Sequence, residues 1–110
     1  MSHHITIQIQ DTRATRSVQD IENLLHAVHA QPEKLSHVEV DWSRSSYCNV
    51  LIGADHPSKL WAELSKLIAG QDTFNWIRHH WIVAVEGKSG WNDYSIVAHF
   101  DPSVPLDIRR

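Results

Sequence analysis

Hydrophobic and polar residues alternate at the start of the chain. Ile5, Ile7 and Ile9 are separated by Thr6 and Gln8, and this period of two places every second side chain on one face of a β-strand. The same alternation returns over 37–42 and over 47–53, where the apolar positions are Val38, Val40, Trp42, Cys48, Val50 and Ile52. We therefore expect three strands with one buried face each, the second and third forming a hairpin around the polar turn 43–46.

Two other segments carry hydrophobic residues at helical spacing. The first lies over 18–28 and ends near Ala30, before Pro32; the second follows Asp55 and His56, with Pro57 in its first turn and Gly70 at its end. Their apolar stripes are Val18, Ile21, Leu24, Leu25 and Val28 in the first, and Leu60, Trp61, Leu64, Leu67 and Ile68 in the second. The short connection 71–77 contains Phe74, Trp76 and Ile77, which predicts a packed turn of helix.

Residues 79–100 have the pattern of a final β-hairpin that is apolar on both faces. A four-residue turn from Gly87 to Gly90 places Glu86 opposite Trp91, Val83 opposite Tyr94, and Trp81 opposite Ile96. This register predicts that Val83, Val85, Tyr94 and Ile96 face the helices, and that the hairpin is central to the sheet.

The predicted order is strand, helix, strand, strand, helix, strand, strand. It indicates an α+β two-layer sandwich, with a largely antiparallel five-stranded sheet and two helices on one face. At 110 residues the chain corresponds to one domain, 1–110. Residues 101–110 are expected to form a C-terminal tail, because Pro102 and Pro105 remove backbone donors. The pattern does not determine the strand order.

Composition narrows the possible partners and location. Ten Lys and Arg against thirteen Asp and Glu give a formal charge of -3, which disfavours binding to a nucleic-acid backbone. The longest apolar runs, of four or five residues, are too short to cross a membrane. The absence of a secretory signal pattern and the single Cys48 favour a cytoplasmic location. Cys48 is expected to be a buried apolar residue without a catalytic role.

Nine histidines are the unusual feature of the composition. His80, His99 and Asp101 on the final hairpin, and Glu22, His26 and His29 on one helix stripe, could be considered as metal ligands. Neither set has the ligand spacing of a known metal motif, so we expect no metal and no cofactor. The sequence also lacks a nucleophile elbow, a phosphate-binding loop and a dinucleotide fingerprint. We therefore expect no enzymatic activity.

Five tryptophans suggest binding to another protein, because tryptophan is enriched at interface hot spots. Trp42, Trp61 and Trp81 lie on stripes that we assign to the core, whereas Trp76 and Trp91 lie in a connection and at a turn. We predict a partner-binding surface at the turn of the final hairpin. Its members are Glu86, Trp91, Asn92 and Asp93, together with Trp76, His80 and His99.

These features favour a small cytoplasmic protein-binding inhibitor, foremost a bacterial immunity protein that neutralises a toxic enzyme, such as a basic nuclease, by direct binding. The interpretation uses the acidic balance, the aromatic hairpin, and carboxylates expected on exposed sides of strands: Glu39, Asp41, Glu86 and Asp93. Two alternatives stay open. One is a homo-oligomeric scaffold, such as a homodimer; the other is a small enzyme that uses hairpin histidines and carboxylates.

Overall fold

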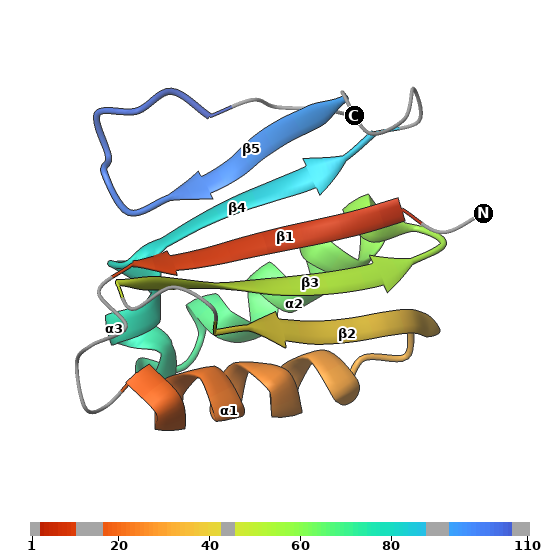
Figure 1. Cartoon of the computed structure of the whole chain (residues 1–110), viewed down its shortest axis with the longest axis horizontal. Helices are drawn as coiled ribbons and strands as arrows, with labels where there is room; N and C mark the ends of the chain where they lie inside the picture. The colour runs from red at the N-terminus through yellow and green to blue at the C-terminus, as the bar shows by residue number, and fades with distance from the viewer. Residues whose placement is uncertain (1–2, 11–16, 43–45, 88–92, 107–110) are drawn as a thin grey trace.

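Five strands form one antiparallel sheet in the order β2-β3-β1-β4-β5 (Figure 1). The computed structural model describes residues 3–10, 17–42, 46–87 and 93–106. The strands are β1 (His3–Gln10), β2 (Leu35–Asp41), β3 (Tyr47–Ala54), β4 (Trp81–Glu86) and β5 (Tyr94–His99). The predicted α+β fold with a five-stranded antiparallel sheet is confirmed.

The first strand of the chain is the central strand of the sheet. β1 pairs with β3 on one side and with β4 on the other, and Ile5, Ile7 and Ile9 are fully buried. The apolar positions of the alternation that predicted this strand therefore lie on the face that the helices cover. The final hairpin lies at the edge, with β5 outermost, so the prediction that it is central is wrong: β1 separates β4 from the other hairpin.

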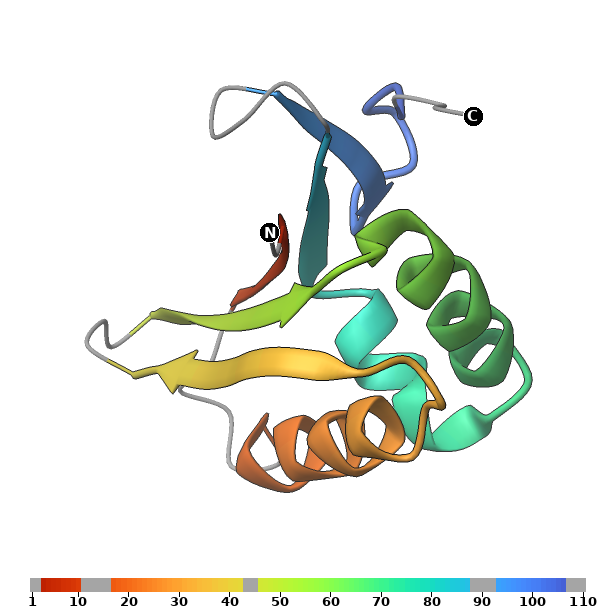
Figure 2. The same ribbon diagram turned by 90° about the vertical axis from the view of Figure 1, so that its right-hand side faces the viewer.

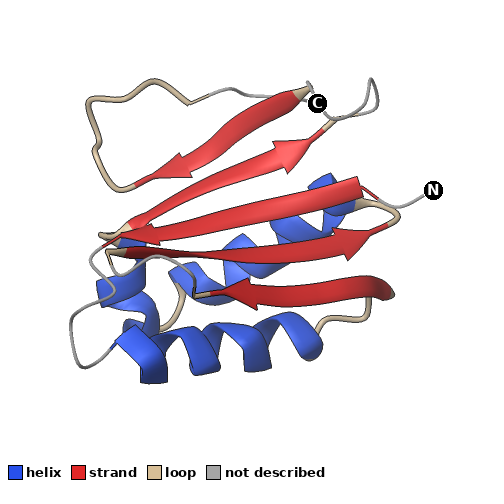
Figure 3. Cartoon of the chain, in the orientation of Figure 1, coloured by secondary structure: helices blue, strands red, loops and turns tan. Residues whose placement is uncertain are grey.

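The two long helices cover one face of the sheet, as predicted (Figures 2 and 3). They are α1 (Ser17–His29) and α2 (Pro57–Ala69), and their apolar stripes join the strands in one core. The connection after α2 forms a short 3-10 helix, η1 (Asp72–Phe74), and one turn of helix, α3 (Asn75–Arg78), as its aromatic content indicated. No helix in the described ranges is long and apolar enough to cross a bilayer.

The register of the final hairpin differs from the prediction. Tyr94 pairs with Glu86 and Ser95 with Val85, and an irregularity between Val83 and Ala84 shifts the pairing further along. Val83 and Val85 are buried as expected, but Tyr94 is exposed and Ile96 is half-buried, so their predicted places in the core are wrong. β4 ends at Glu86 and β5 begins only at Tyr94. This connection is longer than the predicted turn and changes which residues face each other.

The tryptophans predicted for the core have different environments. Trp81 is buried, and half-buried Trp61 on α2 packs edge to face against it, with ring centroids 5.5 Å apart. Trp42 is 46% exposed, so its predicted burial is wrong. The edge strand β2 ends at Asp41, and Trp42, just beyond this end, lines a hollow beside α1 and is only partly covered.

Candidate binding surfaces

The residues predicted from the sequence to bind a partner do not form one cluster among the described residues. Glu86 ends β4 opposite Tyr94, whereas His80 precedes β4 and His99 pairs with Ile82 near that other end. The length of β4, roughly 17 Å at the usual rise per residue, separates the two groups. Trp91 and Asn92 lie outside the described residues.

Trp76 and His80 form a local pair at the end of α3. Their rings stack with centroids 4.2 Å apart, and His80 Nδ1 donates to the carbonyl oxygen of Trp76 at 2.6 Å. On β5, His99 Nδ1 accepts a hydrogen bond from the backbone N–H of Asp101 at 3.0 Å. His80 thus hydrogen-bonds to the backbone of α3, and His99 to the backbone just after β5. These contacts are local and do not indicate a ligand.

Glu86 connects the start of β1 to the end of β4. Its Oε1 accepts a hydrogen bond from the backbone N–H of His4 at 2.9 Å, and Nδ1 of His3 and Nδ1 of His4 lie 3.8 and 3.5 Å from the same oxygen. Glu86 is only 9% exposed, so the expectation that it lies on an exposed side of its strand is wrong. The pKa of the neighbouring Tyr94 hydroxyl is raised, mainly by partial burial and to a smaller extent by the charge of Glu86.

Asp93 packs closely against Gly87. The backbone N–H of Gly87 donates to the carbonyl oxygen of Asp93. A Cβ atom on Gly87 would collide with Asp93 Oδ2, so a side chain at position 87 does not fit beside this carboxylate. The structure thus places Glu86 and Asp93 at the same end of the hairpin.

An apolar groove runs between α1 and the edge strand β2, and we call it the α1–β2 groove. It consists of two adjoining hollows that share Leu25 and Val40. Its lining residues are Val18, Ile21, Glu22, Leu25, His29, Leu35, Ser36, His37, Val38, Val40 and Trp42. The hydrophobic pattern did not predict this groove, because it placed Val18 and Trp42 on buried stripes. The position of Trp42 at the end of a predicted strand was the available signal.

The charges of the α1–β2 groove are acidic. Glu22 is the only Asp, Glu, Lys or Arg among the described residues that line it. Glu39 and Asp41 alternate with Val38 and Val40 along β2 and therefore lie on the opposite face of the sheet, where Glu39 Oε1 is 3.2 Å from His37 Nε2. The groove therefore combines an apolar floor with one carboxylate, that of Glu22.

A second hollow lies between the first turns of α2 and the β4-β5 pair, and we call it the α2-end pocket. Its inner part, about 180 Å³, has apolar walls from Trp61, Ala62, Val85 and Val97 and also contains Ser95. Its outer part is lined by His3, Asp55, His56, Pro57 and Lys59, and the two parts share Ser58, Glu86 and Gly87. The pocket is thus apolar inside and polar at its mouth.

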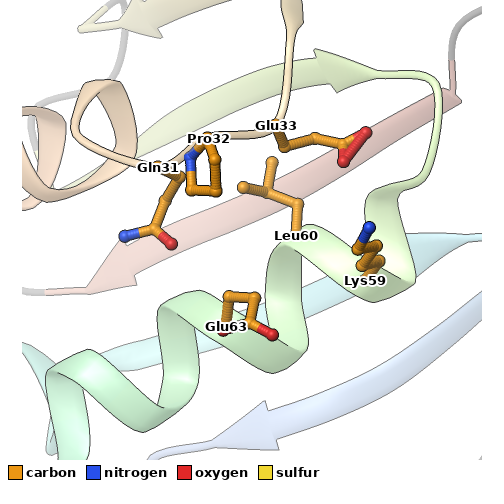
Figure 4. A pocket seen from close by; sticks show the side chains of 6 residues that line it. All are labelled: Gln31, Pro32, Glu33, Lys59, Leu60 and Glu63. Atoms are coloured by element: carbon orange, nitrogen blue, oxygen red, sulfur yellow. The ribbon is translucent and has the colours of Figure 1, made fainter.

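A third hollow lies between the α1-β2 connection and α2 (Figure 4). It measures about 100 Å³ and is lined by Gln31, Pro32, Glu33, Lys59, Leu60 and Glu63. Glu33 Oε1 lies 3.2 Å from His56 Nδ1 and so joins this connection to the start of α2. This volume is smaller than the roughly 150 Å³ of a cavity that accommodates benzene, and we assign the hollow no ligand.

The side chains considered for metal binding or nucleophilic chemistry give no site in the part of the chain that the structure describes. No group of three or more His, Cys, Asp or Glu residues there is arranged to hold a metal ion. Cys48 is buried as predicted, and its burial, with a smaller contribution from Asp41, raises the thiol pKa to about 11. A thiol in this environment is a poor nucleophile at neutral pH.

No protein-family model, curated protein or solved structure matches the chain. The function is therefore inferred from the chemistry of the surfaces described above.

Proposed function

We propose that this protein is a protein-binding domain that covers a basic partner through the α1–β2 groove. The observation that carries the proposal is the exposure of Val18 and Trp42, 51% and 46%, in a groove whose lining is mostly apolar. A contiguous apolar surface of this kind, with a polar rim, marks interaction sites on soluble domains.

Energetics favour an occupant with apolar side chains. Covering apolar surface yields about 25 cal/mol for each Å² removed from water. Leu25 and Val40 form a half-buried floor, and Trp42 offers a large side chain that a partner could desolvate. Tryptophans at the centre of interfaces are frequent hot spots.

Charge favours a basic partner. The whole chain carries a formal charge of -3, and the described residues that line the groove include Glu22 but no Lys or Arg. Opposite charges at the rim of an interface accelerate encounter more than they strengthen the final complex. The partner we propose therefore presents apolar side chains surrounded by Lys or Arg.

Within this class, we propose an inhibitor of the bacterial immunity type, located in the cytoplasm, which neutralises a toxic enzyme such as a nuclease. The acidic balance and the acidic apolar groove support this choice over an enzyme. A homodimer is the competing occupant of the groove, because a second copy would also cover Val18 and Trp42.

The proposal is tested by capture, purification and inhibition. The tagged chain is used to isolate a binding protein from its source cells, and the purified partner's own activity is measured with increasing amounts of the chain. Loss of activity at a one-to-one ratio supports the inhibitor proposal. A partner that stays fully active when saturated contradicts inhibition. Sedimentation equilibrium of the chain alone tests the alternative, and a stable dimer that Trp42→Ser dissociates would contradict the proposed occupant.

A further inference from the structure

We infer that the α2-end pocket is a second binding site, which takes a small carboxylate bearing an aromatic ring. This inference does not depend on the proposed protein partner. It uses three features of the pocket: a buried hydroxyl in its inner part, an uncapped helix N-terminus at its mouth, and an inner volume that fits one ring.

The buried hydroxyl belongs to Ser95. Ser95 is 2% exposed and lines the inner part of the pocket, and its Oγ has no hydrogen-bond partner in the described structure. A buried hydroxyl without a partner is unfavourable, because it has lost water without gaining a replacement bond. The other inner walls are the apolar side chains of Trp61, Ala62, Val85 and Val97. A ligand with a hydroxyl at its inner end would satisfy Ser95.

The mouth of the pocket favours an anion. α2 begins at Pro57 without a side-chain cap and without an acidic residue in its first turn, so its N-terminal partial positive charge is not compensated there. Ser58 and Lys59 of this turn line the outer part. Glu86 also lines it, but its Oε1 already accepts the His4 N–H and lies near two imidazoles. Asp55 also lines the outer part and would repel an anion, so we expect a ligand carboxylate to lie toward Lys59.

The volume of the inner part fits one aromatic ring. A cavity of about 150 Å³ with apolar walls accommodates benzene, and the inner part measures about 180 Å³. Trp61 provides an aromatic wall and Val97 an aliphatic one. A benzene ring with a carboxymethyl group toward α2 and a hydroxyl toward Ser95 uses each of these features.

The experiment titrates the isolated chain with phenylacetate, 4-hydroxyphenylacetate and phenylacetamide, followed by nuclear magnetic resonance. The indole N–H signal of Trp61, assigned with Trp61→Phe, reports the inner pocket. We expect 4-hydroxyphenylacetate to bind about 3- to 10-fold more tightly than phenylacetate, as one neutral hydrogen bond allows. We expect phenylacetamide to bind about 2- to 5-fold more weakly than phenylacetate, because it lacks the charge that the helix end favours.

Two variants separate the contributions. Ser95→Ala should abolish the preference for 4-hydroxyphenylacetate and leave the affinity for phenylacetate unchanged; Lys59→Met should lower the affinity of both acids. If Ser95→Ala does not fold, intermolecular nuclear Overhauser effects in the parent, from the ring to methyl groups of Ala62 and Val97, replace it. The inference is overturned if no probe shifts the Trp61 signal at 10 mM, if the hydroxyl gives no advantage in the parent, or if the acid and the amide bind equally.

Discussion

Val18 on α1 and Trp42 at the end of β2 line the same hollow from its two sides, and each exposes about half of its surface. Trp81, by contrast, is buried in the core. We therefore expect Trp42→Ser to change the free energy of unfolding by about 0.5 kcal/mol or less, as for an exposed position. Trp81→Ala should cost about 3–5 kcal/mol. Urea denaturation of both variants measures the difference, and a large loss in Trp42→Ser would mean that Trp42 supports the fold.

Glu86 offers a test of the contact between the ends of β1 and β4. Glu86→Ala removes the acceptor of the His4 N–H and should cost about 1–3 kcal/mol, the range for leaving a buried donor unpaired. Glu86→Gln keeps an oxygen at this position and should cost less. The comparison requires urea midpoints for both variants at the same pH. Equal losses would indicate that the charge, and not the hydrogen bond, supplies the stabilisation.

The two isoleucines Ile7 and Ile96 test the register of the sheet. Ile7 is fully buried on the central strand, whereas Ile96 is half-buried on the edge strand β5. Ile7→Ala should cost about 2–5 kcal/mol, and Ile96→Ala should cost clearly less because part of its surface already contacts water. Thermal unfolding followed by circular dichroism ranks the two, and the reverse order would restore the register expected from the sequence.

The Cys48 thiol makes stability depend on alkaline pH. Its pKa is raised from 9.0 to about 11 in the folded protein, so the folded state retains a proton that the unfolded state loses. This contribution to stability is present below pH 9 and decreases as the pH rises from about 9 to 11. Cys48→Ala lacks the thiol and is the matched control. The urea midpoint of the parent should fall further than that of Cys48→Ala between pH 8 and pH 10.5, and parallel changes would contradict the assignment.

The sequence predicts the strands and helices well where one face of each is buried. Ile5, Ile7 and Ile9 alternate with polar residues because β1 has helices on one side only, and the stripe that includes Leu60 and Leu64 marks the buried face of α2. The order of the strands in the sheet could not be predicted in this way. That β1 separates β3 from β4 depends on which pairings bury most surface together, and no local pattern encodes this choice.

The candidate surfaces were harder to predict, because they depend on where elements end. Trp42 continues the alternation of β2, yet the strand stops at Asp41 and the tryptophan is exposed. Ser95 has no sequence signal, because the length of the connection between β4 and β5 pairs it with the buried Val85 and so turns it toward α2. The predicted surface at the hairpin turn stays a prediction for Trp91 and Asn92.

The affinity of the purified partner for two variants decides whether the α1–β2 groove is the binding surface. Trp42→Ser alters the groove, and Tyr94→Ser alters a similarly exposed aromatic residue, 41% against 46%, on the opposite edge strand. Isothermal titration calorimetry with both variants and the parent gives the three dissociation constants. We expect Trp42→Ser to weaken binding about 30-fold or more, the effect of losing a hot spot of at least 2 kcal/mol, and Tyr94→Ser to leave it unchanged. Unchanged affinity in Trp42→Ser, with a loss in Tyr94→Ser, would contradict the groove and place the interface at the end of the final hairpin.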